Sequence, residues 1–419
     1  MSCNCSCDFG NTLQYVSPAH GGWGLVRIAA LIPESHQLFV APFACGRHGA
    51  LGGTLNGIKD KISYLYIDES DIVSGGYEDL IPPAVGELLE SLEKRPKVVI
   101  IFVTCLDDLL GTDHVQLQKR LSEQYPDIRF ISCHMNPISE NMKFPPGISM
   151  QNNLYSLLDK KEEQVNAVNF IGNHSPIDKE CELYDIIAKN GYTLNHISDF
   201  ESFEDYQSMA QSKLNLVLSP VAKYASEQMK EKLGMDFLLA YNTYDLQEIR
   251  EFYKELEAQL GVKIEVAEYE EKARKKIEEA KEIIGKRPIA IDYQAVKKPF
   301  TLAKALLEYG FCVALVMTDN VKEIEKEAYD YIVENHKEVT IANAVHPTMV
   351  EHGYRNKENY LCIGFDCGYA TGSDKVFGLL LDEYLFGYYG VEKLMEGMMN
   401  ALKRDSDVKE MIEEAHLIV

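Results

Sequence analysis

Short apolar runs alternate with longer amphipathic stretches along the whole chain. The apolar runs have the length of buried β-strands, and the amphipathic stretches carry apolar residues at helical spacing. This alternation predicts parallel sheets with crossover helices. We predict strands at residues 38–41, 61–67, 98–103, 128–132, 167–171, 192–197, 214–218, 288–292, 312–316, 339–342 and 360–363. The helices predicted between them include 79–92, 115–123, 177–190, 246–260 and 299–309.

The chain is long enough for several domains. Its 419 residues exceed what one hydrophobic core usually organises. A loop-like stretch over 143–159 closes a first unit, and a charged helix over 267–284 leads into the last one. We interpret that helix as a solvated connector, with docking of a partner as the alternative. The fold prediction is α/β, with Rossmann-like domains at 1–160, 161–266 and 267–419.

Composition and charge narrow the functional classes. The net charge of −23 argues against nucleic acid and against an anionic membrane surface, because both would repel the chain. No apolar run approaches the roughly 18 residues of a transmembrane helix, and the start of the chain does not resemble a signal peptide. Ten cysteines without secretion signals favour a reducing, cytoplasmic location.

Two cysteines stand at the ends of predicted strands. Cys45 follows the apolar run 37–41, and Cys105 follows the run 97–103. Ligands bind at the carboxyl ends of strands in open α/β sheets, so two thiols there suggest a metal site. Ordinary buried thiols are the alternative, because free cysteine is among the most buried residue types. Spacing alone leaves both interpretations open.

The segments around these cysteines resemble a known family. The turn Pro42-Phe-Ala-Cys45, and Thr104-Cys105 with Leu110-Gly-Thr-Asp113 after it, are similar to the two cysteine turns of nitrogenase component 1, the family of the molybdenum-iron protein subunits. The likeness continues over most of the chain. It implies three Rossmann-like domains with parallel sheets around a central cleft. It also implies an iron–sulfur cluster, 4Fe–4S or larger, bound by Cys45 and Cys105.

The resemblance implies a function with named partners. We expect a nitrogenase-like reductase, the catalytic component of a two-component system. It would pass electrons from an ATP-dependent iron protein to a small-molecule or tetrapyrrole-like substrate. Ser219 stands where the catalytic nitrogenase subunit has its cofactor cysteine, so we do not expect dinitrogen as the substrate. The alternatives are a cofactor-assembly scaffold of the same type, and a binding fold without metal.

The number of ligands has a consequence for assembly. Two cysteines are fewer than the usual four ligands of a 4Fe–4S cluster. A homodimer would supply four by symmetry, and a heterodimer with a related subunit would do the same.

Further residues are candidates near the cluster or the substrate. Gly46 and His48 follow Cys45, and we predict Gly46 at the cofactor and His48 as a proton donor, with a surface role as the alternative for the histidine. His346 follows a predicted strand and is a candidate acid on the substrate side. His20 lies in a glycine-rich segment that permits close approach to an inorganic group, and a loop histidine without metal is its alternative.

The first residues carry three more thiols at alternate positions. Cys3, Cys5 and Cys7 are candidate cluster or metal ligands, and a disordered tail is the alternative. Three carboxylates flank Cys105, namely Asp107, Asp108 and Asp113. We expect these carboxylates to support the start of a helix, because negative charge is favourable at a helix N-terminus.

Overall fold

The computed structural model describes residues 13–19, 24–135, 145–351 and 359–417. The chain forms two compact units. The amino-terminal unit comprises Trp23–His174 and Tyr192–Ala240, and the carboxyl-terminal unit comprises Met1–Gly22, Ser175–Gly191 and Tyr241–Ile418. The domain limits predicted from the sequence stay a prediction. Among the residues that the structure describes, no helix combines the length and apolar character needed to span a bilayer.

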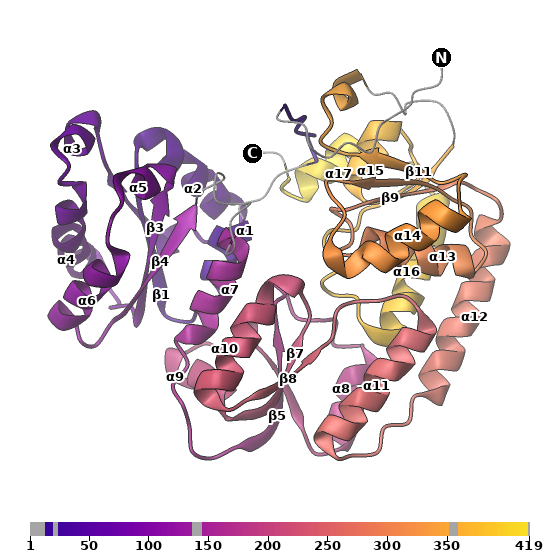
Figure 1. Cartoon of the computed structure of the whole chain (residues 1–419), viewed down its shortest axis with the longest axis horizontal. Coiled ribbons are helices and arrows are strands. Elements are labelled where there is room, and N and C mark those ends of the chain that lie inside the picture. The colour runs from indigo at the N-terminus through magenta and orange to yellow at the C-terminus, as the bar shows by residue number, and fades with distance from the viewer. Residues whose placement is uncertain (1–12, 20–23, 136–144, 352–358, 418–419) are drawn as a thin grey trace. The chain divides into compact units, whose positions relative to one another are not determined.

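The first sheet of the amino-terminal unit is parallel and has the strand order β2-β1-β3-β4 (Figure 1). Its strands are β1 (Ser35–Ala41), β2 (Ile62–Tyr66), β3 (Val98–Thr104) and β4 (Arg129–Met135). The helices of this part are α1 (Gly24–Ala29), α2 (Phe43–Leu55), α3 (Glu69–Ser74), α4 (Ile81–Ser91), α5 (Cys105–Leu110), α6 (His114–Gln124) and α7 (Pro146–Ser156). Every residue of β1 and β3 is buried, as expected for central strands that are covered on both faces.

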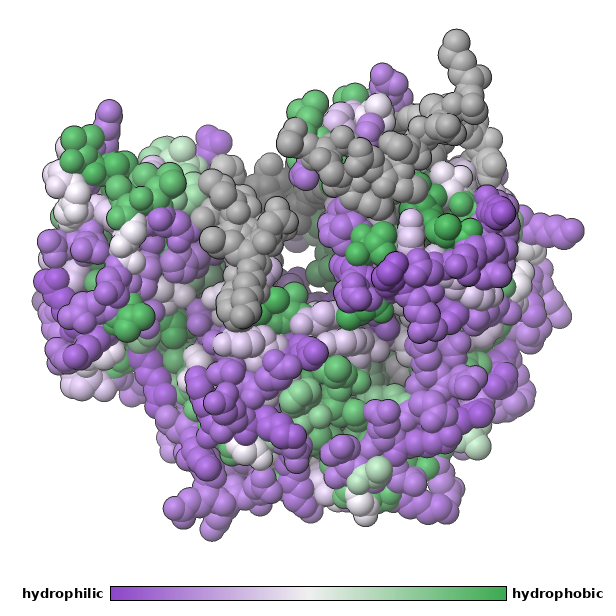
Figure 2. All heavy atoms as spheres, in the orientation of Figure 1, coloured by the Kyte–Doolittle hydropathy of each residue, from purple (hydrophilic) through white to green (hydrophobic). Residues whose placement is uncertain are grey.

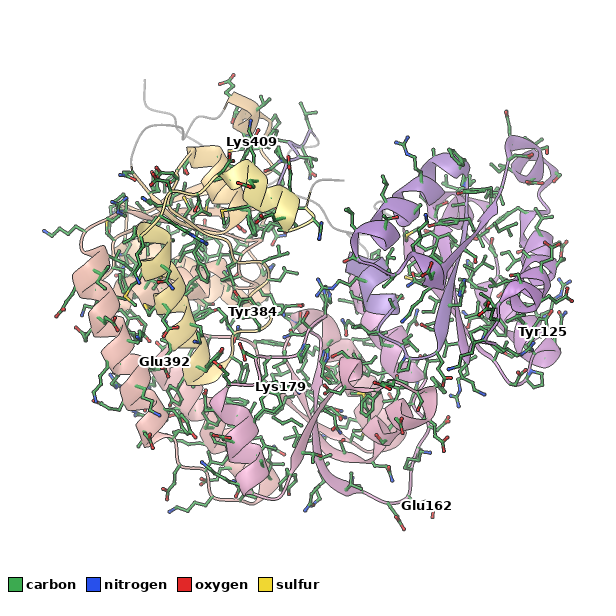
Figure 3. All side chains as sticks on the ribbon, turned by 180° about the vertical axis from the view of Figure 1, so that it is seen from behind. Tyr125, Glu162, Lys179, Tyr384, Glu392 and Lys409 are labelled. Atoms are coloured by element: carbon green, nitrogen blue, oxygen red, sulfur yellow. The ribbon has the colours of Figure 1, made fainter. Side chains whose placement is uncertain are left out.

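Two helices cover one face of the first sheet. Apolar residues of α4 and α6 pack in one cluster with alternate residues of β1 and β3. Tyr125 follows the end of α6 and is labelled in Figure 3. The alternation places Val99 and Ile101 in this cluster, whereas Phe102 stacks on Phe39 outside it. The sheet is therefore apolar on both sides, which explains why its strands appear as continuous apolar runs in the sequence.

The second sheet of the amino-terminal unit repeats the same strand order. It is parallel and runs β6-β5-β7-β8, which is again second-first-third-fourth along the chain. Its strands are β5 (Val165–Ile171), β6 (Thr193–His196), β7 (Ser212–Val217) and β8 (Asp236–Leu239), and its helices are α9 (Phe203–Tyr206) and α10 (Lys223–Leu233). Helix α7 packs against α10 and so links the two sheets of this unit.

The third sheet lies in the carboxyl-terminal unit and has a different order. It is parallel and runs β11-β10-β9-β12-β13, the third-second-first-fourth-fifth order of Rossmann folds. Its strands are β9 (Ile289–Asp292), β10 (Val313–Thr318), β11 (Thr340–Asn343), β12 (Leu361–Ile363) and β13 (Val376–Phe377). The helices of this unit are α8 (Glu182–Lys189), α11 (Leu246–Leu260), α12 (Ala267–Ile284), α13 (Pro299–Glu308), α14 (Lys326–Asn335), α15 (Phe365–Thr371), α16 (Gly387–Leu402) and α17 (Val408–Glu414).

The predicted α/β class with parallel sheets is confirmed. Each strand predicted from the apolar pattern overlaps a strand of the structure, while β8 and β13 lie outside those predicted ranges. The helix predicted over 177–190 begins only at Glu182. Its first residues form a turn instead, in which the Asp178 carboxylate accepts a hydrogen bond from the Glu180 amide at 2.9 Å.

Helix α12 is more than the solvated connector predicted from its charge. Ala273, Ile277, Ala280 and Ile284 lie at helical spacing and are buried, and α12 packs along α16. Its opposite side carries ion pairs such as Lys272–Glu268 at 2.9 Å, and hydrophilic residues cover the visible surface of this helix in Figure 2. The abundant charges hid a narrow apolar stripe of small and β-branched residues.

A glycine at the end of β12 generates a stability prediction. Gly364 has φ +112°, and a Cβ atom there would overlap the carboxylate of fully buried Asp292. Asp292 is fixed in place, because its carboxylate accepts hydrogen bonds from the amides of Gln294, Ala295 and Cys367. We expect Gly364→Ala to lower the free energy of unfolding by about 3 kcal/mol or more, from backbone strain and steric overlap together.

The matched control is Gly191→Ala. Gly191 also has positive φ, at +75°, but a Cβ atom there meets open space. Its substitution should cost only about 1–2 kcal/mol. Urea-induced unfolding of both variants measures the difference, and equal losses of stability would contradict the role assigned to the Asp292 contact.

Candidate functional site

Cys45 and Cys105 lie at the carboxyl edge of the first sheet. Cys45 is in the first turn of α2, just after β1, and Cys105 is the first residue of α5, directly after β3. The two strands are neighbours, and the last pair in their register joins Val40 and Val103. Both cysteines are partly buried and free. We call them the cysteine pair.

The two thiols interact electrostatically. Burial, and next the neighbouring Cys105, raise the pKa of the Cys45 thiol. Both effects disfavour the thiolate, since a charged sulfur is poorly solvated there and a second thiolate would repel it. A bound metal reverses this preference, because coordination deprotonates a thiol outright. In the metal-free chain the Cys45 thiol is therefore less readily deprotonated than an ordinary cysteine.

The strand order also places the cysteine pair where the direction of the chain across the sheet reverses. The chain runs outward in opposite directions from β1 and β3, since α2 leads to β2 on one side while α5 and α6 lead to β4 on the other. Such a reversal is a topological switch point, where a crevice opens beyond the carboxyl ends of the two strands. The cysteine pair stands at that switch point.

Glycines allow α2 to approach the sheet closely. A Cβ atom on Gly49 would lie 2.6 Å from the Phe39 ring, and one on Gly53 would lie 2.5 Å from Ile62. A Cβ atom on Gly46 would lie 2.9 Å from the Tyr66 ring. The three glycines recur at helical spacing along one side of α2. They fix the height of this helix above the sheet, and with it the position of Cys45.

Exposed apolar side chains lie on the two helices that carry the cysteine pair and at the end of the adjacent strand β2. Phe43 is 66% exposed and its ring lies 5.2 Å from that of Tyr66, which ends β2. Leu109 and Leu110 end the helix that Cys105 begins, and Leu109 is 77% exposed. We call these four residues the apolar rim. Figure 2 shows hydrophobic residues gathered over α3 and α5 on this side of the sheet.

The other predicted site residues have different positions. Gly46 is buried in α2 beside Cys45, and His48 lies one turn further along the same helix. His346 belongs to the carboxyl-terminal unit, where it follows β11 and shares a 2.7 Å hydrogen bond with the Thr348 hydroxyl. Cys3, Cys5, Cys7 and His20 lie outside the described residues. The roles predicted for all these residues stay predictions.

The carboxylates near Cys105 divide between two roles. Asp113 caps α6 as expected, since its side chain accepts a hydrogen bond from the Gln116 amide at 2.9 Å. Asp107 and Asp108 lie in the first turn of α5, but their side chains also contact His114 and His134. Sequence reasoning did not single out these histidines. The strand-end rule would have found His134, because β4 ends at the same edge as β1 and β3.

Three comparisons place the chain among known proteins. The family model described as nitrogenase component 1 type oxidoreductase matches residues 22–403. A curated protein from Clostridium pasteurianum, the nitrogenase iron-molybdenum cofactor biosynthesis protein NifE, is 22% identical over 317 residues, which cover 72% of this chain and 68% of that protein.

Solved structures share the fold. The structure titled "Nitrogenase Cp1 at pH 6.5" matches with a TM-score of 0.68 and 16% identity, over 94% of each chain. The structure titled "Nitrogenase Cp1 at pH 5" matches with a TM-score of 0.59 and 15% identity, over 94% of this chain and 90% of that one.

The proximity of the two thiols generates a chemical prediction. A trivalent arsenical bridges two sulfur atoms only when they lie close together. We expect phenylarsine oxide to block alkylation of Cys45 and Cys105 together in the metal-free chain, and Cys45→Ala to restore alkylation of Cys105. Mass spectrometry maps the modified residues. Exposed Cys312 is the internal control and should stay reactive throughout. Protection of one thiol without the other would contradict the geometry.

Proposed function

The chain belongs to the nitrogenase component 1 type oxidoreductases, and we propose that within this family it is a cofactor-assembly scaffold. It would hold an iron–sulfur cluster on the cysteine pair and deliver the cluster, or a precursor of it, to another protein. The observation that carries this proposal is the similarity to a protein named for biosynthesis of the iron-molybdenum cofactor. The reductase expected from the sequence is the second candidate, favoured by the family description alone.

The chemistry of the cysteine pair fits the group that the family implies. Thiolates are the soft ligands that iron–sulfur clusters take, and the two sulfurs stand together at a switch point. The cluster would supply redox-active iron held near the protein surface. The residues of this chain would contribute two ligands, the burial around them and the apolar surroundings that set the cluster's potential.

A second subunit of the same fold would complete the ligand set. Two cysteines leave a four-iron cluster short of ligands. The apolar rim supports an interface at this place, because the helices that carry the cysteine pair expose apolar side chains to solvent. A symmetric homodimer and a heterodimer with a related chain both satisfy this requirement. Light scattering of the chain alone and with its genomic neighbour distinguishes the two assemblies.

The second sheet argues against dinitrogen as a substrate. Its switch point lies between β5 and β7, where Gly172 and Ser219 are in close contact. A Cβ atom on Gly172 would lie 3.0 Å from the Ser219 amide nitrogen and 2.9 Å from the Cβ atom of Ala222. Ser219 is buried, and a hydroxyl is a poor ligand for soft iron compared with a thiolate. Protein atoms fill this edge of the second sheet. At the equivalent edge of the first sheet, the strand ends carry the cysteine pair instead.

Cluster binding is tested by removing either ligand. We expect Cys45→Ala and Cys105→Ala to lower the iron and sulfide retained after anaerobic reconstitution at least about tenfold. Loss of a direct ligand weakens metal binding more than loss of a residue that only contacts a ligand, which itself typically costs about 10–100-fold in affinity. Cys133→Ala, in β4 of the same sheet, and Cys312→Ala are the matched controls and should retain parental iron. Parental iron content in both ligand variants would exclude this site.

Delivery and reduction are separated by following iron and electrons. The loaded, reduced chain is mixed anaerobically with a metal-free component 1 protein, or with a panel of tetrapyrroles and small substrates. A scaffold should lose iron to the acceptor protein and stay reduced with the substrates. A reductase should keep its iron, while the electron paramagnetic resonance signal of the reduced cluster disappears when substrate is added. That second outcome would overturn the scaffold proposal.

A further inference from the structure

A second cluster of metal-ligating side chains lies at the same edge of the first sheet. Asp107 comes from α5, His114 is the first residue of α6, and His134 lies near the end of β4. One ligand atom from each of the three residues lies within 4.8 Å of the other two. We call these residues the histidine cluster. Three separate elements bring them together, so the arrangement depends on the fold rather than on spacing in the sequence.

Burial leaves two polar atoms of this cluster without partners. The side chain of Asp107 is 3% exposed and that of His114 is 12% exposed. Asp107 Oδ1 and His114 Nδ1 are buried and accept or donate no hydrogen bond among the described residues. Buried polar atoms without a partner cost free energy, and native proteins rarely leave them so. An ion bound to the Asp107 carboxylate and to one ring nitrogen of His114, together with its water, would use this free ligand capacity.

The contacts of His134 match those of a metal-bound histidine. Its Nδ1 shares a 2.9 Å hydrogen bond with Asp108 Oδ1. Metal-ligating histidines usually bond one ring nitrogen to a carboxylate, which fixes the tautomer and leaves the other nitrogen's lone pair for the metal. The ring of His134 meets that of His114 edge-on, with 4.7 Å between the ring centres. In a metal site, Asp108 would be the outer partner of His134 and Asp107 the carboxylate that faces the ion.

We propose that Asp107, His114 and His134 bind one zinc ion. Two imidazoles and a carboxylate are a common zinc set, which leaves a fourth position for water. Tetrahedral zinc with bonds of about 2.0–2.1 Å holds its ligand atoms about 3.3 Å apart, so the contacting side chains of Asp107 and His114 separate slightly when the ion enters. This ligand set of nitrogen and oxygen atoms differs from the two thiols of the cysteine pair and needs no iron–sulfur cluster.

The zinc would have a positioning role for the neighbouring site. Asp107 lies two residues after Cys105 on α5, while the other ligands belong to α6 and β4. The ion therefore ties the short helix that carries Cys105 to the element that follows it and to the edge of the sheet. The proposal does not rest on the scaffold function, because the histidine cluster is complete within this chain.

The test measures metal binding in a chain that cannot use the cysteine pair. The full-length chain is titrated with Co²⁺ and then with Zn²⁺ after Cys45 and Cys105 are replaced by Ala and Cys3, Cys5 and Cys7 by Ser, so that none of the candidate thiol ligands can contribute. We expect one equivalent of Co²⁺ to give visible d–d absorption without intense sulfur-to-cobalt charge transfer, and Zn²⁺ to displace it. Asp107→Asn, His114→Gln and His134→Gln should each weaken binding by more than about 100-fold, and Asp108→Asn by about 10–100-fold.

A histidine outside the histidine cluster serves as the control, and the parent chain, with all its cysteines and histidines in place, gives a second measurement. His336→Gln should bind as the parent does, because His336 lies in the carboxyl-terminal unit and bonds Glu338 instead. In the parent chain, Zn²⁺ should protect His114 and His134, but not His336, from modification by diethyl pyrocarbonate. Parental affinity in both histidine variants, no uptake of metal, a thiolate-type cobalt spectrum, or no protection of the two histidines would each overturn the proposal.

Discussion

The close packing of α2 on the first sheet is the constraint on which the cysteine pair depends. Phe39 stacks on Phe102 with 4.7 Å between ring centres, so the ring that faces Gly49 has little freedom to move. Any side chain at Gly49 would have to lift the helix off the sheet. The thiol of Cys45, one turn before it, would move with the helix. The distance between the two cysteines is thus set by van der Waals contact beneath them rather than by bonds between them.

Each of the three sheets has a switch point, but different residues occupy it in each sheet. In the first sheet the switch point presents two thiols and an apolar rim. In the second, Gly172 closes against Ser219, and in the third, Gly364 closes against the Asp292 carboxylate. In the second and third sheets, a glycine at the end of one strand lets protein atoms from the neighbouring strand end occupy the switch point. The strand order offers a place for a ligand, and the residues at the strand ends decide whether the place is used.

The fold could be predicted further than the site. Buried parallel strands such as β3 are continuous apolar runs, and these are visible without knowing their neighbours. Helix α2 was not predicted, because four glycines in its thirteen residues oppose helix formation until the sheet supports it. The cysteine pair was found from strand ends and family resemblance. The histidine cluster was not, because His134 reaches Asp108 and the ring of His114 only after β3 and β4 pair.

The glycines of α2 have a dynamic consequence. Each glycine inside a helix costs about 0.8–1 kcal/mol relative to alanine, so α2 has little helical stability apart from the sheet. Segments of that kind open at a free energy well below that of global unfolding, and amide hydrogen exchange reports such opening. Undocking of this one helix would uncover Cys45 while the strands stay paired. The packing that positions this thiol therefore involves a helix that can detach from the sheet before the sheet itself unfolds.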